Sequence, residues 1–137
     1  MSYQNTFIQI APDSNAASGT EPTPRGMQKT VPLWEFELLS QHPYEFTRDE
    51  LLFRIHLERQ DLMALDEAEK EQVRAELFSK PHPCLRASAL PKRYGWGVHH
   101  DAEGRIAIYA VDSAEYARLS DPANGLQQLK AMRSSRK

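Results

Sequence analysis

The residues with the most chemistry lie together in one segment, SKPHPCLRASALPKRYGWGVHH, at positions 79–100. This segment holds a thiol, several basic side chains, two kinds of aromatic ring and adjacent histidines, which are groups that bind anions, attack electrophiles or ligate metals. The candidate binding residues are Arg86, Ser88, Lys92, Arg93, Tyr94, Trp96 and His99. These residue types raise three hypotheses, namely anion recognition, thiol catalysis and nucleic-acid binding.

Anion recognition is the working hypothesis for this segment. The bases Arg86, Lys92 and Arg93, together with the hydroxyl of Ser88, can surround a phosphate or a carboxylate, and arginine offers such groups a planar fork of donors. Residues 79–105 carry five bases and two acids, a net charge of +3, in a chain whose net charge is −2. We therefore expect Arg86 and Arg93 to share a partly open concavity that attracts an anionic small molecule or an anionic group on a protein.

Aromatic residues and glycines alternate directly after the bases. Tyr94 and Trp96 can stack on a ring of the ligand, and the missing side chains of Gly95 and Gly97 permit close approach of a ligand or of a packed element. The structural alternative stays open, and it is favoured for the aromatic rings. In that alternative the rings belong to the core and the glycines accommodate a neighbouring segment.

Cys84 is the only cysteine, so the chain forms no internal disulfide and has no thioredoxin-like pair. The Cys-x5-Arg pattern of phosphatases also fails, because Leu90 stands at the position of the arginine. A small enzyme that uses Cys84 with a histidine is the alternative function. We instead expect an unreactive, largely buried thiol, as is usual for a free cysteine.

The histidines give no ligand pattern for a metal. His99 and His100 are neighbours on a predicted strand, so their side chains point to opposite faces of the sheet. Neither an HExxH motif nor a CxxC pair occurs. We expect no metal and no cofactor.

The block PCLRASALPKRYGWGVHHDAEGRIAIYA resembles the signature of a family of small bacterial proteins, known only as a domain of unknown function and marked by PCLRAS-x-LPKRYGWG. The resemblance extends to NTFIQIAPD near the N-terminus and to KAMRSSRK at the C-terminus, so it spans nearly the whole chain. It implies a single-domain protein. It implies no activity, cofactor or catalytic residue.

Nucleic-acid binding through the basic segment 86–96 and the tail 125–137 is a further alternative. The stretch LLSQHPYEFTRDELLFRIHLER resembles the helix-turn-helix of winged-helix response regulators. In that family the next helix would read DNA, but here that helix, DEAEKEQVRAELF, carries five carboxylates, which repel DNA. Nucleic acid is therefore a partner that the sequence does not favour.

Composition indicates one ordinary globular domain. The chain has 137 residues, of which 40% are apolar and 26% charged, which suffices for a core without disulfides or a structural metal. The N-terminus has no signal-peptide pattern, and no apolar run approaches the ~18 residues that cross a bilayer. We expect a cytoplasmic protein with no membrane partner.

The order of the expected helices and strands along the chain predicts an α+β fold. We expect residues 1–137 to form a single domain. We expect a small antiparallel sheet built on a C-terminal hairpin, with three to four helices covering one face. The order is a strand at 6–10, a long loop at 11–29, helices at 31–41, 47–59 and 66–80, and hairpin strands at 93–101 and 105–112. Residues 81–93 show no period, Asp112 is expected to cap a short helix, and the basic tail 125–137 is expected to hold one more helical turn.

Overall fold

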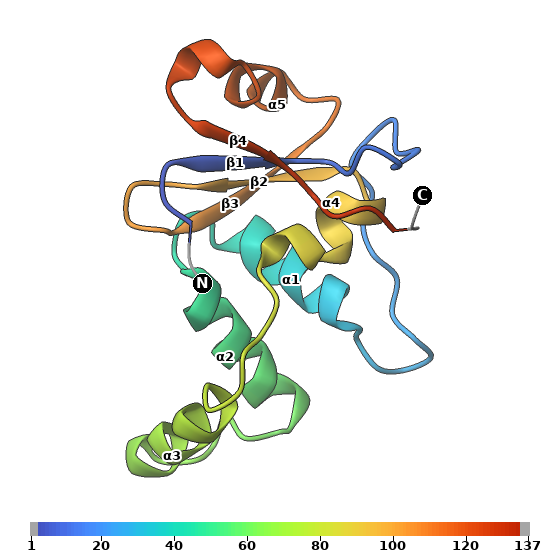
Figure 1. The fold of residues 1–137 in the computed structure, drawn as a ribbon. Helices are drawn as coiled ribbons and strands as arrows, with labels where there is room; N and C mark the ends of the chain where they lie inside the picture. Colours follow the sequence, from blue (N-terminus) through green and yellow to red (C-terminus); the bar gives the residue numbers. More distant parts are fainter. Residues whose placement is uncertain (1–2, 135–137) are drawn as a thin grey trace.

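A mixed four-stranded sheet forms the centre of the computed structural model, which describes residues 3–134 (Figure 1). The strands are β1 (Thr6–Gln9), β2 (Trp96–His100), β3 (Ile106–Ala110) and β4 (Gln127–Lys130). Their order is β3-β2-β1-β4, with β1 parallel to β4 and the other neighbours antiparallel. The predicted α+β class is confirmed, and the parallel strand β4 makes the sheet mixed rather than purely antiparallel.

The predicted hairpin forms between β2 and β3. Val98 lies opposite Ile108, and the turn is closed by a 3.0 Å hydrogen bond from the Gly104 amide to the Asp101 carbonyl. Gly104 has a φ of +79°, which glycine adopts without a steric penalty. The strands are shorter than predicted. The short helix α4 (Ala89–Arg93) ends at Arg93 and Gly95 has a φ of +82°, so β2 begins only at Trp96.

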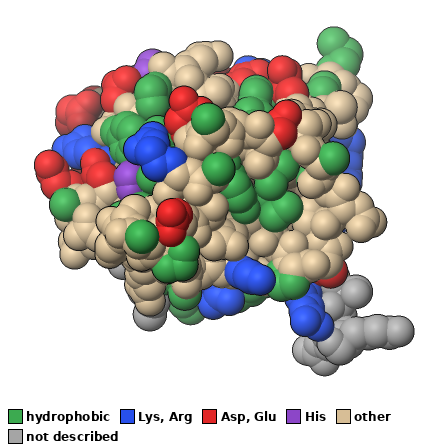
Figure 2. All heavy atoms as spheres, turned by 90° about the horizontal axis from the view of Figure 1, so that it is seen from above, with side chains coloured by type: hydrophobic (Ala, Val, Ile, Leu, Met, Phe, Trp, Pro, Cys, Tyr) green, Lys and Arg blue, Asp and Glu red, His purple; other side chains and the backbone are tan. Residues whose placement is uncertain are grey.

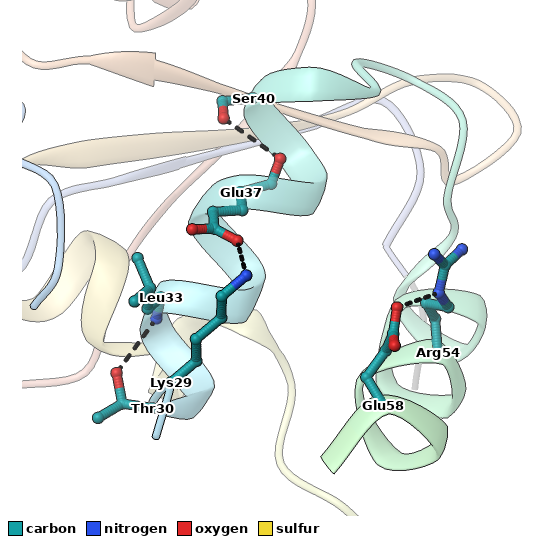
Figure 3. A network of polar contacts seen from close by, with 7 residues as sticks. All are labelled: Lys29, Thr30, Leu33, Glu37, Ser40, Arg54 and Glu58. Atoms are coloured by element: carbon teal, nitrogen blue, oxygen red, sulfur yellow. Dashed lines mark hydrogen bonds and ion pairs between the residues drawn. The ribbon is translucent and has the colours of Figure 1, made fainter. Parts of the chain in front are cut away.

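Three predicted helices are confirmed, and their caps explain where they begin. Thr30 caps the first helix by accepting a hydrogen bond from the Leu33 amide (Figure 3). Thr47 and Asp66 each form a capping box with the glutamate three residues later, which satisfies amides that a helix N-terminus leaves open. The helices are α1 (Val31–Gln41), α2 (Arg48–Arg59) and α3 (Glu67–Leu77).

Ion pairs mark the solvent sides of α1 and α2. Lys29 contacts Glu37 at 2.6 Å, and Arg54 contacts Glu58 one turn later on α2 at 3.0 Å (Figure 3). Such partly exposed pairs contribute little to stability. They show which helix sides face water, and therefore which sides are left to pack inward.

Two short helices differ from the sequence expectation. Residues 85–87 form a 3-10 turn, η1 (Leu85–Ala87), and α4 follows it, although this segment shows no helical period. The last helix, α5 (Ala114–Leu119), is capped by Ser113 rather than by Asp112. Helices α4 and α5 are each too short to show a hydrophobic period, so packing on the sheet decides their conformation.

The expected helical turn in the tail is wrong, because Gln127–Lys130 forms strand β4. This strand pairs with β1 from the other end of the chain, with Ile8 opposite Leu129. A pairing between distant segments overrides weak local preferences, and no local pattern announces it. A 3-10 turn, η2 (Pro122–Asn124), leads into β4.

Helices cover both faces of the sheet rather than one. On the side of α1, α2 and α4, the core is built around apolar residues that include Ile8, Leu39 and Val98. On the other side, α5 covers Phe7 with Tyr116 and Leu119 (Figure 1). Seen from the α5 side, Figure 2 shows apolar side chains among acidic and basic ones. No helix within residues 3–134 has the length and apolar character needed to cross a bilayer.

His100 lies on the same face of the sheet as Val98, on the side of α1, α2 and α4, and its ring is uncharged. It is 1% exposed, and neither ring nitrogen has a hydrogen-bond partner of good geometry. Burial first, and the neighbouring His99 second, lower the pKa of His100 to about 4, against smaller opposing effects of Asp101 and the Val98 backbone. The unfolded chain therefore binds a proton at His100 below about pH 6.5 while the folded chain does not, so this residue costs stability as the pH falls toward 4.

Replacing His100 with leucine should stabilise the protein at pH 7 by about 1–3 kcal/mol, because it removes buried polar atoms that lack partners. The difference in unfolding free energy between the variant and the wild type should be about 2 kcal/mol larger at pH 5 than at pH 7, since only the wild type carries the titrating ring. Urea unfolding of both proteins at the two pH values measures this. A pH-independent difference would contradict the account of His100 as buried and neutral.

Candidate functional site: a cleft between α1, α2 and residues 77–89

A cleft of about 460 Å³ lies between α1, α2 and the segment 77–89. Figure 1 shows this segment running from α3 up to α4 beside α1 and α2. The walls are mainly apolar and include Leu51, Leu52, Ile55, Leu77 and Leu85, and the polar residues among them are Glu35, Arg48, His56, Arg59, Gln60, His82, Cys84 and Ser88. An apolar hollow of this size with a few polar groups is typical of small-molecule sites. We call it the α1–α2 cleft.

Arg48 holds one wall of the α1–α2 cleft in place. Its guanidinium group donates hydrogen bonds to the carbonyls of His82 and Pro83, and it contacts Asp49 at 2.7 Å. The residue is 6% exposed, and its Nε–H has no hydrogen-bond partner among the described residues. The wall at 82–83 is therefore fixed by a buried cation that keeps one donor unused.

Glu35 brings a buried carboxyl group to the opposite side of the cleft, on α1. The Ser88 hydroxyl accepts a hydrogen bond from the Leu90 amide at 3.1 Å and donates its own hydrogen to Glu35 Oε1, 2.8 Å away. Oε2 of Glu35 takes no hydrogen bond from the described residues, and it is not sealed from solvent. Burial raises the pKa of Glu35 to about 7, against the opposing hydrogen bond from Ser88. Near neutral pH the carboxyl group is thus protonated in a large share of molecules.

Neither Glu35 nor Arg48 was among the sequence candidates. Glu35 did leave a signal, because it lies four residues after Val31 and four before Leu39 on the buried side of α1, and a carboxyl group on an apolar helix face is unusual. Arg48 left none, since a basic residue in the first turn of a helix is normally exposed.

The structure separates the predicted basic residues. Arg86 donates from Nε to the Lys130 carbonyl at 2.7 Å, which ties η1 to β4. Lys92 and Arg93 line a second, more open hollow together with residues of the 13–20 loop. Of the predicted anion-binding residues, Ser88 lines the α1–α2 cleft and Arg93 lines the second hollow, while Arg86 lines neither of them.

The aromatic residues and glycines of the segment serve packing. Tyr94 and Trp96 pack against the core, and Trp96 Nε1 donates to the Thr20 carbonyl at 2.8 Å. A Cβ atom on Gly95 would lie 2.2 Å from the Ser18 carbonyl oxygen. The structural alternative for this segment therefore describes it better than a ligand-stacking surface does.

His99 lies on the α5 side of the sheet, away from the cleft. Its Nδ1 is 2.7 Å from the Tyr44 hydroxyl, which is 2.8 Å from the Tyr109 hydroxyl. Burial lowers the pKa of His99, and burial together with Tyr109 raises the pKa of Tyr44. Burial thus favours the neutral forms of His99 and Tyr44, and the hydrogen bonds among the three side chains fasten the residues before α2 to the sheet.

Cys84 is half-buried and lines the α1–α2 cleft, so it is more accessible than expected. Its Sγ lies 3.3 Å from the Tyr3 hydroxyl. Two histidines line the same cleft, but His82 donates from Nε2 to the Leu77 carbonyl at 2.7 Å. Within residues 3–134, no hydrogen bond joins Cys84 to a histidine, and no group of three acidic, histidine or cysteine side chains is placed to hold a metal ion.

Replacing Glu35 with glutamine should stabilise the protein more at pH 8 than at pH 5. The folded protein holds the Glu35 proton up to about pH 7, whereas the unfolded chain loses it near pH 4.5, so the wild type loses stability as the pH rises between these values. The gain of Glu35→Gln should be about 2 kcal/mol larger at pH 8, as measured by urea unfolding. An equal gain at both pH values would show that the carboxyl group is not buried as described.

Comparison with known proteins identifies the family of this chain. No curated protein and no solved structure matches the chain. One family model, described as a family of unknown function (DUF6157), matches residues 1–137. The match covers the α1–α2 cleft, the sheet and both ends, and the chain therefore belongs to this family of unknown function.

Proposed function

We propose that this protein is a small binding module whose ligand has an apolar body and an anionic group, and that the ligand lies in the α1–α2 cleft. The apolar walls favour a ligand that loses apolar surface to water on binding. The cleft also carries the cations of Arg48 and Arg59, and Glu35 is the one acid among the described residues that line it. This charge balance favours an anion, provided that Glu35 is protonated.

The observation that carries the proposal is the guanidinium group of a nearly buried arginine, Arg48, among the mainly apolar residues that line the cleft. The Arg48 Nε–H has no hydrogen-bond partner among the described residues, which costs about 1–3 kcal/mol, but it is sealed from solvent, so a ligand oxygen would accept from it only after the wall shifts. A hydrogen bond from a guanidinium group to a carboxylate is also stronger than a neutral one. A carboxylate on an apolar chain is therefore the ligand chemistry that matches both the apolar walls and the guanidinium groups of Arg48 and Arg59.

The second hollow, beside Lys92 and Arg93, is the alternative place for an anion. It is more open than the cleft, and its other lining residues are the small and polar residues of the 13–20 loop with Ser134. This hollow offers an anion positive charge but no apolar walls. A preference for carboxylates with long apolar chains would thus favour the cleft, and indifference to chain length would favour the hollow.

A cytoplasmic, bacterial setting stays part of the proposal and rests on the sequence alone.

Octanoate should raise the melting temperature of the protein, because a ligand that binds only the folded state stabilises it by an amount that grows with the ratio of ligand concentration to Kd. At pH 6, the rise should be several degrees at millimolar octanoate, and smaller for butyrate, 1-octanol and octylamine. Differential scanning fluorimetry at equal concentrations of the four compounds compares apolar length and head-group charge directly.

A matched pair of variants on α2 locates the effect. Leu52 lines the cleft, and Leu52→Trp should fill it and abolish the octanoate shift. Phe53, the next residue, packs beneath the Arg74 guanidinium instead, so Phe53→Trp should keep the shift. Equal shifts for all four compounds, or an unchanged octanoate shift in Leu52→Trp, would contradict the proposed site.

A further inference from the structure

Glu35 places a carboxyl group in the same cleft that the proposed function assigns to an anion. If Glu35 were ionised, two negative charges would share a water-poor site, where repulsion is much stronger than in water. If Glu35 is protonated, the carboxyl group becomes a donor. The protonation state of this one residue therefore decides whether the cleft repels or accepts an anion.

We propose that an anionic ligand enters the α1–α2 cleft together with one proton, which Glu35 holds on Oε2 and donates as a hydrogen bond to the ligand. The affinity of the protein for its ligand would then rise as the pH falls. This inference rests on the proposed function and adds the way in which binding is regulated.

The hydrogen bonds around Glu35 determine where the proton sits. The Ser88 hydroxyl accepts from the Leu90 amide and donates to Oε1. Oε1 is thus an acceptor, and a proton on Glu35 belongs on Oε2. That oxygen has no partner among the described residues, although the whole residue is only 9% exposed. The protonated carboxyl group therefore has a donor to offer, and the cleft is the space it lines.

The other charged and titratable groups of the cleft come from two elements besides α1. Helix α2 supplies Arg48, His56 and Arg59, and the segment 77–89 supplies His82 and Cys84. On α4, which also packs on α1, the bases Lys92 and Arg93 line the second hollow instead. None of these groups is an acid that could share the Glu35 proton. The burial that raises the pKa of Glu35 to about 7 makes the proton available at neutral pH, and an anion beside it would hold the proton more firmly.

Isothermal titration calorimetry with octanoate at pH 6 and pH 8 tests the inference. Octanoate affinity of the wild type should fall about tenfold between these values, because the protonated fraction of Glu35 falls by that factor around a pKa near 7. At pH 8, titrations in two buffers with different ionisation enthalpies should show uptake of nearly one proton per octanoate bound.

Glu35→Gln is the decisive variant, because its amide accepts from Ser88 and donates toward the cleft at every pH. It should bind octanoate equally well at pH 6 and pH 8, without proton uptake. A pH dependence that persists in Glu35→Gln would assign the proton to His56 or His82 and overturn the inference, while the proposed function would stand. Wild-type affinity that rises with pH, with proton release, would also overturn it. Failure of both proteins to bind octanoate at pH 6 would refute the proposed function and the inference with it.

Discussion

The hydrogen bonds from the Arg48 guanidinium group to the carbonyls of His82 and Pro83 are the contact on which the cleft depends. Pro81 and Pro83 have no amide hydrogen, so a segment of this composition can be fixed chiefly through its carbonyl oxygens. Arginine suits this task because its planar fork reaches several acceptors, which a lysine ammonium cannot do in the same geometry. Burial of the cation is costly, and these charge-assisted hydrogen bonds offset the cost.

The sheet fixes the other side of the cleft through α4. This helix leads directly into β2 and packs on α1, and Ser88 at its N-terminus both caps it and contacts Glu35. One hydroxyl group thus connects the backbone geometry of α4 with the orientation of a buried carboxyl group. The cleft is held by polar contacts at both ends, at Arg48 and at Ser88, while its walls are apolar. Such an arrangement keeps a hollow open where apolar side chains alone would collapse into it.

The fold was predictable where its signals are local. The capping box of α2 and the Asp101–Gly104 turn each act within four residues, so the sequence predicts those elements correctly. Strand β4 depends on β1 at the other end of the chain, and no local pattern indicates it. The candidate site shows the same division. Ser88 was identified and lines the cleft, whereas Arg86 is held by the Lys130 carbonyl and lines neither hollow. Arg48 was missed because the carbonyls that it contacts lie more than thirty residues away.

Nuclear magnetic resonance of the protein with octanoate tests the central claim most directly, because it reports where the ligand lies. Methyl groups that line the α1–α2 cleft, on Leu52, Ile55 and Leu85, should show intermolecular nuclear Overhauser effects to the octanoate chain. The Arg48 Nε–H signal should shift as the carboxylate binds. Contacts confined to the 13–20 loop with Lys92 and Arg93, or an absence of any contact at saturating octanoate, would contradict the assignment of this cleft as the binding site.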